Sequence, residues 1–351
     1  MRKIRVLVVE DSMVFRELLI RNLNMDPGIE VVATARDPFE ARDMILAHKP
    51  DVMTLDIELP RMSGIEFLRK LMPQYPIPVV MISSLSDKVF DAMTAGAVDF
   101  VCKPPAGASR EDIENFIRME LPVKIKIASV AKLNNTRRRE EVHSGHYNRS
   151  PVNKKDMVIA IGASTGGTEA IYSVVKGFHK DIPGVVIVQH MPAGFTKMYA
   201  KRLNDGCEVE VKEAENGDVV RPGLVLLAPG GDCHMELVRQ DEGYRVLLKN
   251  KPKVNGHCPS VEGLFESVAK HAGANAIGII LTGMGGDGAK GLLSMKNAGA
   301  STIGQDESTC VVYGMPRVAY ECGAVEYQMK LEDIPEKTYQ ILNMRERGGG
   351  R

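Results

Sequence analysis

A serine in a glycine-rich turn, Ser164, is the residue of this chain best suited by its surroundings to act as a nucleophile. It lies in GASTGG, residues 162–167, directly after the apolar run 157–161 and before a segment with helical spacing. A serine at such a strand-to-helix turn has its hydroxyl raised clear of the sheet, next to backbone N–H groups that could hold an oxyanion. A tight turn also requires small residues, so the assignment depends on partners elsewhere in the chain.

A histidine and an aspartate could complete the proton relay that a serine nucleophile needs. His190 ends the β-branched run 185–190, and Asp287 follows the strand-like run 276–283. Because catalytic groups gather at the carboxyl ends of parallel strands, we expect these two side chains to meet Ser164 at one edge of a sheet. The chain order serine, histidine, aspartate differs from the order in an α/β-hydrolase.

Five short apolar runs alternate with amphipathic stretches in the first hundred residues, which predicts a doubly wound parallel α/β domain. The runs cover residues 4–9, 30–34, 52–55, 78–83 and 99–102. At their ends lie Glu10 and Asp11, then Asp56, then Ser83, and finally Lys103. Three carboxylates at one edge repel each other unless a cation neutralises them, and hard oxygen ligands suit Mg²⁺. The lysine and the hydroxyl would then meet a phosphoryl group.

This set of strand-end residues resembles the receiver domain of bacterial response regulators, which has a flavodoxin-like fold, over residues 1–104. The resemblance implies that Asp56 accepts the phosphoryl group and that Lys103 pairs with its oxygens. It also implies that the peptide bond between Lys103 and Pro104 is cis, as the corresponding bond usually is in this family. The implied Mg²⁺ ligands are Glu10, Asp11, Asp56 and the backbone carbonyl of Glu58, and the implied switch residues are Ser83 and Phe100.

Composition narrows the class of protein. With 351 residues the chain should form about two domains, each with its own core. Lys+Arg and Asp+Glu are equal at 45 each, and the one basic cluster, 137–139, is followed by two glutamates, so we expect no nucleic-acid partner. The six cysteines include no CxxC pair, and neither a signal peptide nor a membrane-spanning apolar stretch is recognisable. We therefore expect a cytoplasmic protein that does not insert into membranes.

The expected boundary between the domains lies in a polar stretch. Residues 110–131 could form a helix, whereas residues 133–155 are too polar to bury enough surface to offset their ordering entropy. The expected parts are a receiver domain at 1–104, a helical and then flexible linker at 105–155, a catalytic domain at 156–346 and a tail at 347–351.

The second domain repeats the α/β pattern, which predicts a doubly wound, mostly parallel sheet. Strands are expected at 157–161, 185–189, 208–212, 224–228, 276–281 and 301–304, and helices near 167–178, 195–204, 260–272 and 288–298. An antiparallel hairpin at a sheet edge is expected over residues 234–250.

The strings IGASTGG, VVIVQHMP, LAPGG and LTGMGGDGAKG, joined to a receiver, resemble the protein-glutamate methylesterases of bacterial chemotaxis over nearly the whole chain. The resemblance implies that Ser164 is the nucleophile, His190 the general base and acid, and Asp287 the carboxylate that orients the imidazole. It further implies that the backbone N–H of Met284 contributes to the oxyanion hole and that Thr165 lines the site.

The implied reaction is hydrolysis of γ-glutamyl methyl esters on the cytoplasmic helices of methyl-accepting chemoreceptors, with release of methanol, and deamidation of specific receptor glutamines. Esterase chemistry of this type needs no cofactor, so Mg²⁺ would belong to the receiver alone. A chemotaxis histidine kinase would supply the phosphoryl group, and the protein would work as a monomer whose unphosphorylated receiver covers the catalytic site.

Three alternatives remain open from the residues themselves. His234 and His257 are possible bases in place of His190. The string GMGGDG, residues 283–288, matches a dinucleotide fingerprint, with Asp306 eighteen residues beyond Gly288, although the carboxylate within it would repel a pyrophosphate. A response regulator could also carry a DNA-binding output domain, which the neutral charge balance disfavours.

Overall fold

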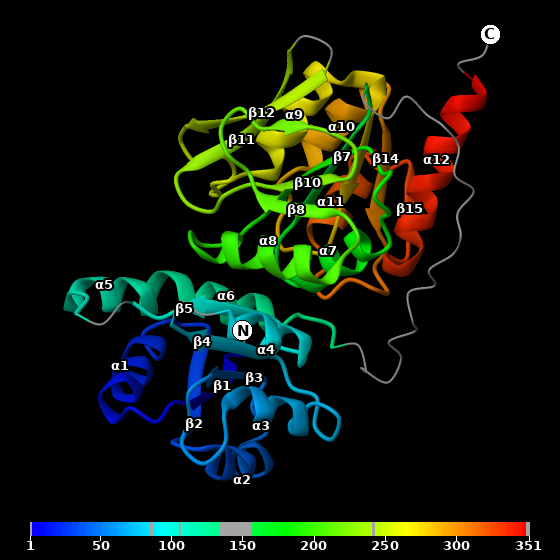
Figure 1. Ribbon diagram of the computed structural model, residues 1–351. Helices are drawn as coiled ribbons and strands as arrows, with labels where there is room; N and C mark the ends of the chain where they lie inside the picture. Colours follow the sequence, from blue (N-terminus) through cyan, green and yellow to red (C-terminus); the bar gives the residue numbers. More distant parts are fainter. Residues whose placement is uncertain (1, 85–86, 105–106, 134–155, 241–242, 349–351) are drawn as a thin grey trace. The chain divides into compact units, whose positions relative to one another are not determined.

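We describe the protein from a computed structural model that covers residues 2–84, 87–104, 107–133, 156–240 and 243–348 (Figure 1). The chain folds into two compact units, residues 1–138 and 139–351. Among the described residues, every helix is too short or too polar to span a lipid bilayer.

The first unit is a five-stranded parallel sheet flanked by helices. Its strands are β1 (Ile4–Val9), β2 (Ile29–Ala35), β3 (Val52–Asp56), β4 (Val79–Ser83) and β5 (Asp99–Cys102), and the helices between them are α1 (Met13–Leu23), α2 (Pro38–His48), α3 (Gly64–Leu71) and α4 (Lys88–Thr94). The strand order β2-β1-β3-β4-β5 is that of a flavodoxin-like fold. All five predicted strands are confirmed, each within one residue at its ends.

A helical segment after β5 belongs to this first unit. It consists of α5 (Arg110–Asn115), the π-helical turn η1 (Phe116–Glu120) and α6 (Leu121–Ala128). The segment buries Ile117, Leu121 and Ile125, and α6 contacts β3, β4 and β5. Pro122 lacks the N–H that would continue the α-helical ladder, which accounts for the wider turn just before it. The rest of the predicted linker, residues 134–155, lies outside the described residues.

The second unit is built on a seven-stranded parallel sheet. Its strands are β6 (Val158–Ala163), β7 (Gly184–Gln189), β8 (Glu210–Glu213), β10 (Leu224–Leu227), β13 (Ala276–Ile280), β14 (Ser301–Gln305) and β15 (Tyr327–Met329). The helices are α7 (Gly167–Lys176), α8 (Phe195–Gly206), α9 (Val261–His271), α10 (Ala289–Asn297), α11 (Met315–Glu321) and α12 (Ile334–Gly348), with short 3₁₀ turns η3 (Gly273–Asn275) and η4 (Leu331–Asp333).

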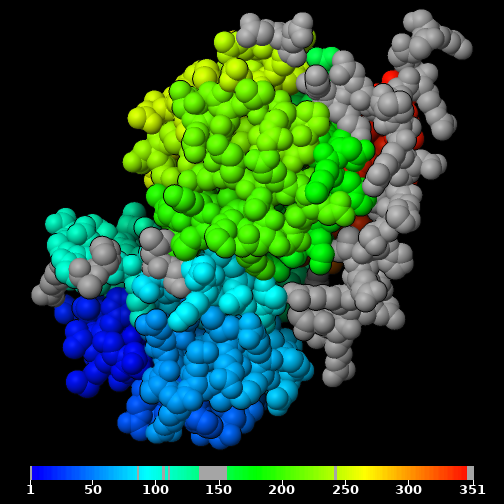
Figure 2. Space-filling view, in the orientation of Figure 1, coloured from blue at the N-terminus to red at the C-terminus, as the bar shows by residue number. Residues whose placement is uncertain are grey.

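Both faces of this sheet are buried, as the continuous apolar strands require. Val158 and Ala160 of β6 pack in one core with Phe265 of α9 and Leu292 of α10. Because side chains alternate along a strand, the equally buried Ile159 must face the opposite layer. In the space-filling view, residues coloured green to yellow-green, which include α8, cover the face of this unit that is turned to the viewer (Figure 2).

The predicted antiparallel hairpin is present, but its expected position at the edge of the main sheet is wrong. The hairpin strands β11 (Cys233–Gln240) and β12 (Gly243–Asn250) form a separate three-stranded sheet with β9 (Val219–Val220). Their inward residues, among them Met235 and Tyr244, are buried in the same core as α9. Apolar alternation in the hairpin therefore serves this layer rather than the edge of the parallel sheet.

The strand order β15-β14-β13-β6-β7-β10-β8 places a topological switch point between β6 and β13. The chain leaves β6 toward β7 on one side and returns much later to β13 on the other side. In open α/β sheets, ligands bind in the crevice at the carboxyl ends of strands that flank such a point. Ser164, His190 and the segment leading to Asp287 follow β6, β7 and β13 respectively.

Candidate active site

The backbone holds the ends of β13, β6 and β7 in a fixed register. Ala163 pairs with Gln189 of β7, and Gly162 pairs with Ile280 of β13. Just beyond these pairs, the amide of Ser164 donates to the Thr282 carbonyl at 3.0 Å, and the amide of His190 donates to the Ala163 carbonyl at 3.2 Å. Ser164 and His190 therefore follow neighbouring strands at the same level of the sheet, as their positions after two apolar runs predict.

Glycines around Ser164 are required by close packing. A Cβ on Gly283 would lie 2.7 Å from the Ser164 Cβ and 2.4 Å from the Met315 Sδ. Gly166 has a φ of 77°, a conformation that strains any residue with a side chain, and a Cβ there would lie 2.6 Å from Val311. The glycine-rich strings thus fix the backbone turn that presents the Ser164 hydroxyl, which is half-buried.

His190 and Asp287 form a buried pair. The His190 Nε2 lies 2.9 Å from the Asp287 Oδ2, and their side chains are 9% and 1% exposed. A carboxylate accepts hydrogen bonds only, so the proton on the imidazole belongs to Nε2 and the lone pair to Nδ1. In the described part of the chain this Nδ1 is buried and has no hydrogen-bond partner. The free lone pair is what a general base requires.

Asp287 is held at the start of α9 by donors from three directions. Its Oδ2 accepts from the Val261 amide at 2.7 Å, and its Oδ1 accepts from the Ser260 hydroxyl at 2.8 Å and from the Asn255 side-chain amide at 2.9 Å. Burial by itself raises the pKa of Asp287, but the hydrogen bonds from His190, Asn255 and Ser260 outweigh it and lower the pKa to about 2. The carboxylate is therefore ionised over the whole physiological range.

A buried amide ties the nucleophile strand to the base strand. The Gln189 side-chain nitrogen donates to the Ser164 carbonyl at 2.9 Å and to the His190 carbonyl at 3.1 Å. Gly167 leaves the space for this side chain, because a Cβ there would lie 2.1 Å from the Gln189 Oε1. Gln189 was not among the predicted site residues, because its position at the end of an apolar strand gives no sign of this role.

Met284 and Thr165, the other two residues predicted for this site, differ in their exposure to solvent. Met284 follows Gly283 and is 45% exposed, whereas Thr165 is 3% exposed. The Thr165 carbonyl accepts from the Thr282 hydroxyl at 3.0 Å, so Thr165 helps to anchor the turn. Within the described residues, no hydrogen bond joins the Ser164 hydroxyl to His190. Such bonds are often long before substrate binds.

The two alternative bases have other positions. The His234 Nε2 contacts the Pro252 carbonyl at 3.1 Å, and its Nδ1 accepts from the Ser260 amide at 3.2 Å, so His234 is a buried structural residue. His257 instead stacks on His190, with ring centroids 3.8 Å apart and an angle of 10° between the rings. The Asn-Gly pair at 255–256 was an available sequence signal for the turn that carries it.

The first unit brings three carboxylates and a lysine together at the ends of β1, β3 and β5. One oxygen from each of Glu10, Asp11 and Asp56 lies within 4.8 Å of the other two, a spacing and ligand type that fit a hard divalent cation. Lys103 Nζ lies 2.9 Å from a Glu10 oxygen and 2.5 Å from an Asp56 oxygen. Burial and the charge of Asp56 raise the pKa of Glu10 to about 7, against the opposing effect of Lys103.

The remaining predicted receiver residues lie on β4, on β5 and just after β3. Ser83 is 3% exposed and donates to the Ser84 carbonyl at 2.8 Å, and Phe100 packs edge-on against Phe90 at 6.5 Å. The Glu58 amide donates to Asp56 at 3.2 Å. Among the described peptide bonds only Cys258–Pro259 is cis, so the expectation of a cis bond before Pro104 is wrong.

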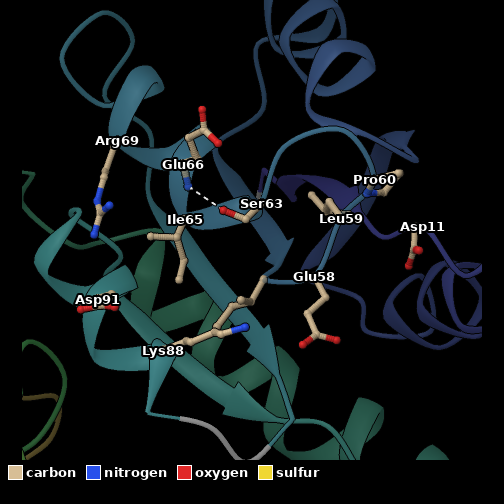
Figure 3. Close-up of a pocket in the computed structure, with 11 residues that line it drawn as sticks. Asp11, Glu58, Leu59, Pro60, Ser63, Ile65, Glu66, Arg69, Lys88 and Asp91 are labelled. Carbon is tan, nitrogen blue, oxygen red and sulfur yellow. Dashed lines mark hydrogen bonds between the residues drawn. The ribbon is translucent and has the colours of Figure 1, made fainter.

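A pocket of about 870 Å³ opens beside this cluster, between the β3–α3 loop and α4 (Figure 3). Asp11, Glu58 and Lys88 contribute charged groups to it, and Ile57 and Leu59 contribute apolar ones. The pocket belongs to the acidic end of the first sheet and includes none of the residues around Ser164.

The first unit thus has the strand order and acidic cluster of a receiver, and the second is an α/β unit with a buried histidine–aspartate pair at the carboxyl end of its sheet. Residues 159–338 match the CheB methylesterase family and residues 6–114 match the response regulator receiver domain family. The chain belongs to the CheB methylesterase family. Neither the dinucleotide-binding nor the DNA-binding alternative finds support in these matches.

Two curated relatives match almost end to end. A protein-glutamate methylesterase/protein-glutamine glutaminase 2 of Syntrophomonas wolfei is 61% identical, covering 98% of this chain and 99% of the relative. A protein-glutamate methylesterase/protein-glutamine glutaminase of Syntrophotalea carbinolica is 50% identical over 98% of this chain and 99% of the relative. The crystal structure of the Thermotoga maritima CheB methylesterase catalytic domain is 40% identical with a TM-score of 0.51, covering 53% of this chain and 98% of that chain.

Proposed function

We propose that this protein is a phosphorylation-regulated methylesterase that hydrolyses γ-glutamyl methyl esters on methyl-accepting chemoreceptors, and that it also deamidates specific receptor glutamines. The observation that carries the proposal is the buried His190–Asp287 pair at the carboxyl end of the second sheet, where Ser164 follows the neighbouring strand β6, in a chain whose relatives are named for these two activities.

In the proposed reaction the Ser164 oxygen attacks the ester carbonyl carbon while its proton passes to the His190 Nδ1. The carbonyl oxygen becomes an oxyanion, which the backbone N–H of Met284 would stabilise, and Thr165 would support the turn that positions it. His190 then returns the proton to the departing methoxide, which leaves as methanol. Water, deprotonated by the same Nδ1, cleaves the acyl-enzyme and restores the glutamate and the Ser164 hydroxyl.

Deamidation follows the same path with a different leaving group. The side-chain amide of glutamine is attacked by Ser164, and His190 donates the proton that lets nitrogen leave as ammonia. The acyl-enzyme is the same glutamyl ester in both reactions. One set of groups therefore supports both activities that the relatives' names describe.

Asp56 is the proposed phosphoacceptor, and a chemotaxis histidine kinase is the proposed phosphodonor. Glu10, Asp11 and Asp56, with the Glu58 carbonyl, would hold Mg²⁺, which neutralises the charge of the incoming phosphoryl group when bound. Lys103, now paired with Glu10 and Asp56, would move its ammonium group to the phosphoryl oxygens. Ser83 and Phe100 would respond to that change. We place these reactions in the cytoplasm, without insertion of the protein into the bilayer, and expect a monomer.

Regulation would follow from a difference in docking between the two receiver states. In this scheme the unphosphorylated receiver covers the Ser164 site and phosphorylation weakens that contact. Each tenfold of activation then corresponds to a difference of about 1.4 kcal/mol in the free energy of docking between the two receiver states.

Methanol release from methylated receptor membranes tests the proposal, measured with and without a small phosphodonor such as acetyl phosphate. Wild type should release methanol faster with the phosphodonor. Asp56→Ala should keep the basal rate and lose the stimulation, and Ser164→Ala should lose both. Ser308→Ala, an exposed serine of the same unit, is the matched control and should behave as wild type. Methanol release by Ser164→Ala at the wild-type rate would refute the nucleophile assignment.

A further inference from the structure

A β-turn formed by residues 254–257 contacts the buried His190–Asp287 pair. The Val254 amide donates to the His257 carbonyl at 3.0 Å, and the His257 amide donates to the Val254 carbonyl at 2.9 Å. Asn255 and Gly256 between them have φ values of 53° and 83°. Positive φ at both central residues is the type I′ pattern that Asn-Gly favours. The turn is thus locally determined by its own sequence.

The first central residue of this turn contacts the acid. The Asn255 side-chain nitrogen lies 2.9 Å from the Asp287 Oδ1. Asn255 itself is exposed, so its backbone sits at the surface while its amide reaches a carboxylate that is 2% exposed. A hydrogen bond to an ionised group is among the stronger ones in proteins.

The residue that closes the turn contacts the base. The His257 ring lies parallel to the His190 ring at 3.8 Å between centroids. A stacked ring at this distance prevents the imidazole of His190 from tilting out of its plane, while leaving its in-plane nitrogens free to form hydrogen bonds. The stack therefore constrains the orientation of the base without occupying its lone pair.

We infer that the turn at residues 254–257 is a positioning element for the proton relay, in which Asn255 fixes Asp287 and His257 fixes the ring plane of His190. This inference rests on the proposed function. One rigid turn constrains both partners of the pair, so the lone pair of the His190 Nδ1 keeps a single direction. Asn255 and His257 do not touch the reacting atoms and take no proton.

The role differs from that of a folding contact because Asp287 keeps other donors. Ser260 and Val261 continue to hold its two oxygens when the Asn255 amide is removed. Loss of the Asn255 side chain should therefore change the precision of the relay more than the stability of the unit. Errors of about 1 Å in catalytic geometry lower rates by about 100-fold, so a smaller displacement should still be measurable.

Asn255→Gly and His257→Ala test the inference in the full-length protein. Glycine tolerates the positive φ at position 255, so this variant removes the amide without straining the turn. His257→Phe keeps a flat ring for stacking and removes the ring nitrogens. Lys253→Ala, an exposed residue of the same loop, is the matched control. The measurements are kcat and KM for methanol release, the thermal unfolding midpoint, and the rate at which a sulfonyl fluoride modifies Ser164.

We expect Asn255→Gly and His257→Ala each to lower kcat and the Ser164 modification rate by about tenfold, in line with loss of one hydrogen bond to a charged group or one ring contact, with KM within about twofold. His257→Phe should recover most of the rate, and the unfolding midpoints should fall by no more than several degrees, so that every variant stays folded at the assay temperature. Wild-type kcat and modification rate in both variants would overturn the inference.

Failure of the inference can be distinguished from failure of the proposed function. If wild type released no methanol from methylated receptors, the proposed function would fall, and the Ser164 modification rates would still test the turn. A loss confined to KM, or a His257→Phe variant as slow as His257→Ala, would also contradict the positioning role.

Discussion

Asp287→Asn is the substitution from which the structure predicts most about the proton relay. The change removes a charge and replaces one carboxylate oxygen by an NH₂ group of nearly the same size. Every neighbour of Asp287 described above donates to it, so the new NH₂ group must face former donors. On the Oδ1 side, the Ser260 hydroxyl can rotate and the Asn255 amide can turn over, so both can become acceptors. The backbone donor on that side, the Glu262 amide, makes only a long contact of 3.4 Å. On the Oδ2 side, the Val261 amide cannot become an acceptor.

The substituted amide should therefore keep its oxygen toward Val261 and the His190 Nε2, and the histidine should keep the proton on Nε2. What is lost is the negative charge that stabilises the imidazolium formed in the transition state. Opposite charges about 4 Å apart interact by about 4 kcal/mol at an effective dielectric constant of about 20, and part of this remains as a neutral hydrogen bond. We expect kcat to fall by about 100- to 1,000-fold, since each tenfold corresponds to about 1.36 kcal/mol.

A larger effect would be expected if the tautomer changed. In the well-studied Ser-His-Asp protease triad the corresponding substitution leaves the histidine in the wrong tautomer and lowers kcat by about 10⁴-fold, because the acid has lost its orienting role. In this protein Ser260 and Asn255 can reverse their hydrogen bonds and so preserve the tautomer of His190. We therefore expect a smaller loss of kcat.

The assay is kcat for methanol release at saturating methylated receptor, together with the free energy of unfolding of each variant. Asp306→Asn is the control, because Asp306 also accepts hydrogen bonds from nearby side chains and a backbone amide in the same unit, at the end of β14. It should keep the wild-type kcat. A kcat for Asp287→Asn within about threefold of wild type would refute the assignment of Asp287 to the relay.

Three further outcomes follow from the same geometry. Gly283→Ala should lower kcat by about 100-fold or more, because its Cβ would displace Ser164, and an unchanged kcat in a folded variant would contradict this packing. Gln189→Met keeps the side-chain volume and removes the tie to two carbonyls, so kcat should fall by about tenfold with KM unchanged; a change in KM alone would count against the tie. The pKa of Asp287 is lowered from 3.8 to about 2, so its ionised form stabilises the fold above pH 3.8 and this contribution is lost as pH falls through about 2. The difference in unfolding free energy between wild type and Asp287→Asn should therefore shrink by about 2 kcal/mol between about pH 4 and pH 2 in denaturant titrations, and a constant difference would show that the carboxylate is not held in this way.

The sequence alone predicted the strands and their chemistry, because strand ends in parallel sheets are readable from apolar runs. Ser164 and His190 follow β6 and β7, and Asp56 ends β3, as those runs indicate. The expected receiver boundary at residue 104 did not include α5, η1 and α6, although α6 contacts β3, β4 and β5 and η1 contacts α1. An amphipathic helix after a domain does not reveal in sequence which surface it covers.

The supporting contacts around the site could not be predicted in the same way. Gln189 looks like one more residue of a buried strand, and its role depends on the carbonyls that two neighbouring strands present to it. The Asn255–Gly256 pair indicates a turn, but nothing in the sequence indicates that this turn contacts Asp287, 32 residues further on. The hairpin β11–β12 was predicted from two strand-like runs on either side of residues 241–243, whereas its separate sheet depends on pairing with the two residues of β9.

The assignment of Ser164 as the nucleophile is tested most directly by a search for the acyl-enzyme on this residue. Wild-type protein would be mixed with a methylated receptor peptide, quenched with acid within the first turnover and digested for mass spectrometry. We predict that the fragment containing Ser164 will carry the added mass of the glutamyl peptide, and that this adduct will accumulate when a slow ester is used. Turnover with no adduct on Ser164, or an adduct on another residue, would contradict the assignment of Ser164 as the nucleophile.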